Sequence, residues 1–205
     1  AIAKGGTVTL TEDIILESSC VISNDVTINL NGKSIKCASS DVFVVTAGTL
    51  TINGNGLVYG SEDNSSSSCA VWAKENGMVV INGGTYKVGH DGASKAANQA
   101  NWRNDCIYAR DNAKITINGG EFTCNGIEGI TAHALWATAG ETTINGGTFN
   151  GKDNYNGFNV DAELGAVVNI NGGKFLPVHS GSLYGEGTIN VMGGEFFDDP
   201  SARVA

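Results

Sequence analysis

The sequence predicts an all-β chain wound into a solenoid of about eight turns. Three observations predict it. One short motif recurs along most of the chain, its apolar residues alternate with polar ones on both sides of a glycine-rich corner, and its copies are separated by connections of variable length. The variable connections favour a solenoid over a propeller, because four-stranded blades need a more constant length.

Each copy of the motif has two apolar residues around a spacer, then Asn or a substitute, two turn residues that are usually Gly, a spacer and a large apolar residue. Four copies contain Ile-Asn-Gly-Gly and span residues 79–86, 115–122, 142–149 and 168–175. Looser copies span residues 28–35, 50–57 and 189–196, and an eighth at 8–15 keeps only the apolar positions. Glycine permits a sharp corner because it has no Cβ, so each copy is predicted to form strand, bend and strand.

Stacked turns should place equivalent residues above one another, in columns of like side chains. One apolar column is predicted to contain Leu10, Leu30, Ile52, Ile81, Ile117, Ile144, Ile170 and Val191. A second is predicted to contain Ile15, Ile35, Leu57, Tyr86, Phe122, Phe149, Phe175 and Phe196. Between them, side-chain amides are expected to hydrogen-bond from turn to turn in a column of Asn31, Asn53, Asn82, Asn118, Asn145 and Asn171.

A third strand is predicted in each turn, at residues 42–45, 70–73, 107–109, 134–137 and 158–160. Three short strands per turn indicate the cross-section of a parallel β-helix. The insertions precede this third strand, at residues 61–68, 89–105, 125–133, 151–157 and 178–182. Because they occupy the same point of each turn, we expect them to emerge along one side of the rod.

The composition indicates a single β-helix domain over residues 1–205, since a solenoid has no internal domain boundary. The residues at both ends suggest a fragment or processed product of a longer chain. With 21 acidic and 12 basic residues, the net charge is −9. Such a surface repels phosphate backbones and polyuronates, so no nucleic-acid partner is expected. No apolar run is long enough for membrane insertion.

Five cysteines cannot all pair within one chain. Cys37 and Cys124 fall in one column but three turns apart, too far for a disulfide. Cys69 and Cys106 belong to neighbouring turns, offset by one residue, and form the one pair to test. The favoured interpretation is that the cysteines are small buried residues in a protein that folds in a reducing compartment.

A binding face, if there is one, is expected on the insertions, because aromatic and polar groups gather there. The candidates are His90, Asp91, Trp102, Arg103, Asp105, Glu128, His133, Asp153 and Tyr155. Aromatic rings with flanking polar groups are used in sugar binding and in protein contacts, although Trp102 could instead cover its own long insertion. A metal site of His90, His133 and Asp91 has no ligand spacing to support it, so neither a metal nor a cofactor is expected.

The same residues include the candidates for a catalytic site. Asp91, Asp105, Glu128 and Asp153 could supply the two carboxyl groups of a glycoside hydrolase, and Arg103 the base of a lyase. Scattered acids on insertions are usually just solvated, so no catalytic residue is assigned and the chain is predicted not to be an enzyme.

The three-strand turn and the Ile-Asn-Gly-Gly-Thr-Phe repeat at residues 144–149 resemble the right-handed, single-stranded parallel β-helices of the pectate-lyase-like superfamily. More narrowly, they resemble the glycine-rich repeat proteins of phage virions and bacterial surfaces. The sequence signatures of the superfamily's polygalacturonases and pectate lyases are absent from this chain.

The resemblance implies a non-enzymatic structural or display module on a virion surface, as a capsid decoration, head fibre or tail fibre. A repeat domain of a bacterial cell-surface or secreted adhesin is the second reading, and a polysaccharide lyase or glycoside hydrolase is the third. The implied partners are other virion or surface proteins and host glycan. A homotrimer is common among similar phage fibres.

Overall fold

The computed structural model describes residues 2–37, 40–60, 68–89, 103–125, 131–151, 157–178 and 180–200. Within these residues the chain is built almost entirely of short strands, preceded by a single 3-10 turn, η1 (Ile2–Lys4). The strands form three sheets, which we call A, B and C. The candidate surfaces described below lie where one sheet passes into the next.

Sheet A contains β1 (Gly6–Thr9), β4 (Val26–Asn29), β7 (Thr49–Asn53), β10 (Met78–Ile81), β13 (Lys114–Ile117), β16 (Gly140–Ile144), β19 (Ala166–Ile170) and β22 (Thr188–Val191). Sheet B contains β2 (Ile14–Leu16), β5 (Ser34–Cys37), β8 (Leu57–Gly60), β11 (Thr85–Val88), β14 (Glu121–Cys124), β17 (Thr148–Asn150), β20 (Lys174–Phe175) and β23 (Glu195–Phe196). Sheet C contains β3 (Cys20–Ile22), β6 (Phe43–Val45), β9 (Ser68–Ala73), β12 (Arg103–Ala109), β15 (Thr131–Ala137), β18 (Gly157–Ala162) and β21 (Leu183–Tyr184).

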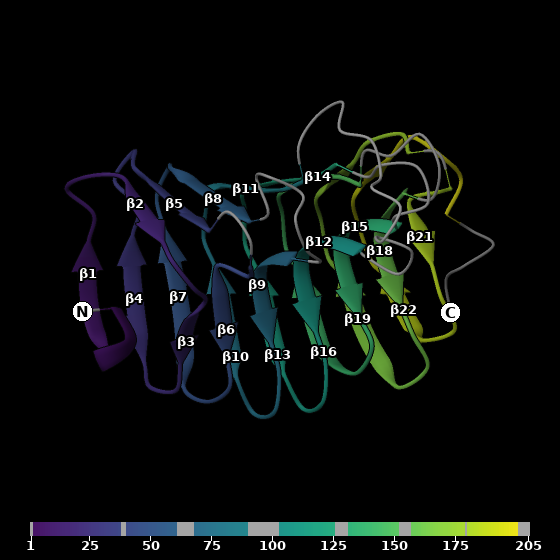
Figure 1. Ribbon diagram of the computed structural model, residues 1–205. Coiled ribbons are helices and arrows are strands. Elements are labelled where there is room, and N and C mark those ends of the chain that lie inside the picture. Colours follow the sequence, from purple (N-terminus) through teal and green to yellow (C-terminus); the bar gives the residue numbers. More distant parts are fainter. Residues whose placement is uncertain are drawn as a thin grey trace, which may run out of the picture.

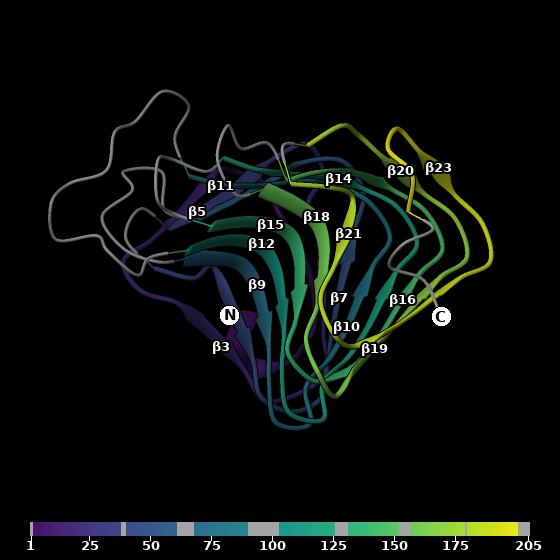
Figure 2. The ribbon, with the colours of Figure 1, turned by 90° about the vertical axis from the view of Figure 1, so that its right-hand side faces the viewer.

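Each strand pairs in parallel with the strand three places along the chain, so the chain returns to the same sheet once per turn. The sheets have eight, eight and seven strands, and β1 and β22 lie at opposite ends of the coil (Figure 1). Seen along the coil, the strands of each sheet lie one behind another around a common interior (Figure 2). This arrangement confirms the predicted parallel β-helix of about eight turns.

The first apolar column is confirmed from Ile52 to Val191, but its beginning was predicted wrongly. Ile52 pairs with Ile28, and Ile28 pairs with Val8. Leu10 and Leu30 lie two residues further on and are still buried. Matching the copies of the motif within the chain predicts both in the column, because the Asn-Gly pair after Leu30 resembles the Asn-Gly-Gly of later turns.

The second column is confirmed at Ile35 and from Tyr86 to Phe196, and it needs two corrections. Ile14, and not Ile15, pairs with Ile35, and Ile15 is 77% exposed. Val58, and not Leu57, stands between Ile35 and Tyr86. The physical reason is the length of the corner between sheets A and B, which is longer in the early turns than in the later ones.

The asparagine ladder is confirmed, with one correction at its start. Each amide nitrogen donates to the amide oxygen of the turn before it, along Asn53→Asn29, Asn82→Asn53, Asn118→Asn82, Asn145→Asn118 and Asn171→Asn145, at 2.8–3.1 Å. Asn29 occupies the first position in place of Asn31, whose amide donates to the Leu10 carbonyl. Asn29 continues the row by donating to the Thr9 hydroxyl at 3.1 Å.

Replacing Asn118 by Asp tests the ladder with almost no change of shape. The new carboxylate would face the Asn82 oxygen, so a donor–acceptor contact becomes a contact between two acceptors. Because the Asn118–Asn82 contact is exposed, we expect a loss of about 0.5–1.5 kcal/mol in the free energy of unfolding at pH 7, measured by urea denaturation. Exposed Asn112→Asp, in the turn just before β13, is the matched control and should change stability by less than about 0.5 kcal/mol.

The Gly-Gly corners follow from two separate constraints. The second glycine of each later pair has a positive φ, for example 96° at Gly84 and 114° at Gly120, which side chains with a Cβ rarely adopt. The first glycine lies against the preceding turn, and a Cβ at Gly146 would come 2.8 Å from the Asn118 carbonyl oxygen. Both Gly146 and Gly147 are therefore needed for adjacent turns to stack at their corner, whereas a Cβ at Gly119 would lie 3.6 Å from the Asn82 carbonyl oxygen, an ordinary contact.

Candidate functional site

The insertions join the ends of sheet B strands to the starts of sheet C strands, as between β11 and β12 and between β14 and β15. Because β8, β11, β14 and β17 are neighbours in one sheet, and β9, β12, β15 and β18 in another, the insertions between them share one edge of the coil. We call it the insertion edge: the last residues of those four sheet B strands and the first residues of those four sheet C strands. The prediction of a common side is supported by these flanking strands.

Buried amides hold the bases of the insertions. Asn104 donates to the Asn125 carbonyl at 3.1 Å, and Asn125 donates to the Gly89 carbonyl at 3.2 Å. One turn further on, the Asn159 side chain accepts from the Gly151 backbone at 2.9 Å and donates to a neighbouring carbonyl. Buried polar groups are costly unless they are hydrogen-bonded, so these contacts fix where each insertion leaves and re-enters the coil.

A charged cluster lies next to this edge, on the side of sheet C away from the apolar core. His133 on β15 contacts Asp105 on β12 through Nδ1 and Oδ1, at 2.6 Å. On its other side, His133 Nε2 lies 3.2 Å from Oδ2 of Asp161 on β18, an ion-pair distance without the alignment of a hydrogen bond. The three side chains are at most 6% exposed. An imidazole is thus held between two buried carboxylates from three successive turns.

The cluster keeps His133 protonated. Burial is the largest single effect and lowers the pKa, but Asp105 and Asp161 together outweigh it and raise the pKa of His133 to about 9. At neutral pH the imidazolium therefore balances one of the two carboxylates. Asp161 Oδ1 is buried and has no hydrogen-bond partner among the described residues, so the imidazolium beside Oδ2 is important for stabilising this side chain in the interior.

The charged cluster is possible because sheet C bends. In a regular strand, residues two apart share a face, yet His133 and Trp136 are three apart and their rings stack, 5.5 Å between centroids. Figure 2 shows β12, β15 and β18 curving together. The bend turns two successive outward columns of side chains toward each other, and Asp161 reaches His133 across it.

Aromatic rings continue from this point along the outer side of sheet C. We call the row the outer ladder, and its successive ring contacts are Trp72–Tyr108, Tyr108–Trp136, Trp136–His133, His133–Phe158 and Phe158–Tyr184, with centroids 4.4–5.9 Å apart. Such contacts contribute about 0.5–1.5 kcal/mol each beyond area burial. Because the ring faces cover one another, the outer ladder stiffens sheet C more than it offers open stacking platforms.

Two of the nine predicted binding residues are brought together, although not as predicted. Asp105 and His133 were placed on insertions, but they lie in β12 and β15 and are buried. Arg103 begins β12, and its side chain is outside the description. The remaining six candidates lie outside the described residues: His90, Asp91, Trp102, Glu128, Asp153 and Tyr155.

The sequence prediction missed Asp161. The predicted third strand ends at Val160, the residue before Asp161, whereas β18 continues to Ala162. Asp161 stands in register with Trp136, and Trp136 with Tyr108, so it interrupts a column of aromatic residues. A charged residue in an otherwise aromatic column is the signal that could have identified it.

The predicted test pair of cysteines does not form a bond. All five cysteines lie within the described residues, and none is in a disulfide. Cys69 faces outward, with its sulfur 3.9 Å from Asp105, whereas Cys106 faces the core and donates to the Tyr86 carbonyl. Cys37 and Cys124 do share one column, separated by Gly60 and Val88, as predicted.

Comparisons with protein families, with characterised proteins and with solved structures find no match to this chain. Across the described ranges, no three His, Cys, Asp or Glu side chains are placed to hold a metal ion. The described part of the chain also contains no helix that is long and apolar enough to cross a membrane.

Proposed function

We propose that the chain is a non-enzymatic display module of a virion surface, in which a stiff coil presents insertions that bind host glycan or a neighbouring protein. The observation that carries this proposal is the fixing of the insertion bases by buried amides of Asn104, Asn125 and Asn159. A coil that holds its connections so firmly at one edge is suited to presenting them as one contact face.

The geometry of the charged cluster favours binding over hydrolysis. Two-carboxylate glycosidases need room between the carboxyl groups for the scissile bond or a water molecule. Here the His133 ring fills the space between Asp105 and Asp161. This pair is therefore better suited to supporting the insertion edge than to glycoside cleavage.

The virion setting is supported by two features. The repeat resembles the Ile-Asn-Gly-Gly-Thr-Phe type of phage virion and bacterial surface proteins. Five cysteines without a disulfide suit a protein assembled in a reducing compartment, which favours a virion protein over a secreted adhesin.

The proposal is tested by replacing residues 90–102 with a short Gly-Ser linker and measuring binding to a printed array of uncharged bacterial surface polysaccharides, which lack the carboxylate groups that a cationic site elsewhere on the coil would bind. We expect the intact chain to bind at least one polysaccharide without releasing reducing ends. The shortened chain should keep its circular dichroism spectrum and lose binding, and a Glu141→Gln control on sheet A should retain it. Unchanged binding after the replacement, or release of sugar products, would contradict the proposal.

A further inference from the structure

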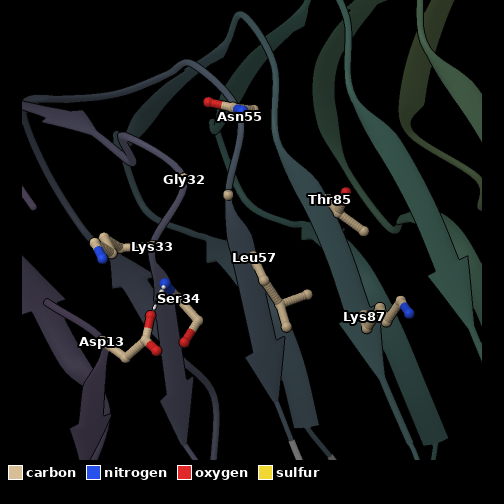
Figure 3. Close-up of a pocket in the computed structure, with 9 residues that line it drawn as sticks. Asp13, Gly32, Lys33, Ser34, Asn55, Leu57, Thr85 and Lys87 are labelled. Atoms are coloured by element: carbon tan, nitrogen blue, oxygen red, sulfur yellow. Dashed lines mark hydrogen bonds between the residues drawn. The ribbon is translucent and has the colours of Figure 1, made fainter.

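A second surface lies at the other end of the sheet B strands, where sheet A turns into sheet B. A hollow of about 470 Å³, open to solvent, is lined there by residues of β5, β8 and β11 and by residues of the corners before β2, β5 and β8. Figure 3 shows Lys33 and Lys87 on opposite sides of this hollow, with Leu57 between them. Its volume is within the range of small-molecule sites, about 300–1,000 Å³.

The hollow exists because the corners change length along the coil. From Ile28 to Ile35 the corner contains two more residues than the equivalent corner from Ile81 to Tyr86. The longer corners therefore project beyond the shorter ones that follow. Gly56 is required in this arrangement, because its φ is 151° and a Cβ would come 2.6 Å from Leu30 Cβ.

The hollow is positively charged although the chain as a whole has a net charge of −9. Lys33 and Lys87 line it, and Lys36 stands in register with Tyr59 and Lys87, with its Nζ 5.6 Å from the centroid of the Tyr59 ring. Asp13 is the acidic residue of the lining.

The Asp13 carboxylate is already engaged. It accepts the Ser34 backbone N–H at 2.8 Å, and this hydrogen bond lowers the pKa of Asp13, with smaller contributions from Lys33 and Lys36. Two lysines of the lining against one such carboxylate leave a local excess of positive charge, and Lys36 beside the Tyr59 ring adds to it. A ligand with a negative group would be attracted here in spite of the acidic surface elsewhere.

A second hollow of about 380 Å³ adjoins the first and shares Asn55 and Thr85 with it. Its lining is polar and includes Glu121 and the backbone of glycine corners, but no lysine. Together the two hollows form a trough that is cationic at one end and rich in amide, hydroxyl and carboxylate groups at the other. Sugar hydroxyl groups can donate to a carboxylate such as Glu121 and accept from an amide such as Asn55.

We propose that this trough binds an oligosaccharide in which a carboxylate-bearing sugar is linked to a neutral sugar. The carboxylate lies between Lys33 and Lys87, and a charge-assisted hydrogen bond from Lys87 requires its exposed side chain, which extends away from Leu57 in Figure 3, to turn toward the hollow. The neutral sugar occupies the second hollow, between Asn55, Thr85 and Glu121. This site is separate from the insertion edge and does not depend on the function proposed for it.

The test measures binding of 3′-sialyllactose and of lactose by isothermal titration calorimetry. We expect 3′-sialyllactose to bind roughly tenfold or more tightly than lactose, with affinity falling as sodium chloride is raised. Lys87→Gln should weaken binding of 3′-sialyllactose roughly tenfold, whereas Lys114→Gln on sheet A should leave it unchanged. Both lysines are exposed, so both variants should fold like the intact chain, and circular dichroism checks this.

The chain in which residues 90–102 are replaced by a linker should bind 3′-sialyllactose as well as the intact chain does. This result separates the trough from the insertion edge, since each site can fail without the other. The proposal is overturned if neither sugar binds, if lactose binds as tightly as 3′-sialyllactose, or if Lys87→Gln and Lys114→Gln have the same effect.

Discussion

Replacing His133 by Gln is expected to lower the free energy of unfolding by about 3–5 kcal/mol at pH 7, because it leaves two buried carboxylates without their positive partner. The His133 ring lies 2.6 Å from Asp105 on one side and 3.2 Å from Asp161 on the other, and all three side chains are buried. Urea denaturation of the two proteins at one pH measures the difference.

A triple variant provides the control. Asp105→Asn, His133→Gln and Asp161→Asn together remove all three charges with little change in shape, so they should be less destabilising than His133→Gln alone. A loss below about 1 kcal/mol in the single variant, typical of an exposed ion pair, would show that the cluster is not buried as described.

The same cluster makes stability depend on pH in a defined direction. The pKa of His133 is about 9 in the folded chain, above the ordinary value of about 6.5, so folding favours the protonated ring. Its contribution is complete below about pH 6.5 and is lost as the pH rises to about 9. In urea denaturation from pH 6 to 9.5, the intact chain should lose stability from this source, and His133→Gln should not.

Replacing Phe149 by Ala is expected to cost about 3–5 kcal/mol in the free energy of unfolding, as large-to-small core substitutions do. Phe149 is fully buried, and its ring stacks on Phe122 and Phe175 with centroids 4.8 and 5.0 Å away. Removing it leaves a cavity in the column and exposes a face of each neighbouring ring to that cavity. Urea denaturation again gives the size of the loss.

Ile15→Ala is the matched control for Phe149→Ala. The motif alone places both residues in the same core column, but the structure leaves Ile15 77% exposed. Its truncation should change stability by less than about 0.5 kcal/mol. Equal losses from the two substitutions would mean that the register of the first two turns is wrong.

The repeat predicted the turns with short glycine corners well. Where Ile-Asn-Gly-Gly recurs, each turn has the same number of residues between the two apolar positions that flank the corner. The motif therefore predicts the register of both columns correctly from Ile81 and Tyr86 onward. In the first turns the longer corner carries a second Asn, Asn31, which imitates the ladder position of Asn29. Sequence alone cannot choose between two asparagines without knowing how far the chain travels around the corner.

The charged cluster was harder to predict than the fold. Asp105 and His133 were predicted only as members of a set of binding candidates on the insertions, and their burial depends on strands that extend into the expected insertions. Asp161 meets His133 only because sheet C bends, which brings together residues that a flat strand would separate. The bend is a property of the packed sheet, and it cannot be predicted from the residues of any one turn.

The row of asparagine amides also gives the coil a direction. Every nitrogen from Asn171 back to Asn53 donates toward the earlier turn, so the amide dipoles add head to tail along the axis. Flipping one carboxamide in the middle would place oxygen against oxygen on one side and nitrogen against nitrogen on the other, with the loss of both hydrogen bonds. The direction of the row can therefore reverse only if all the amides flip together. The amide row is therefore electrically polar along its length, with partial positive charge toward the first turn of the coil and partial negative charge toward the last.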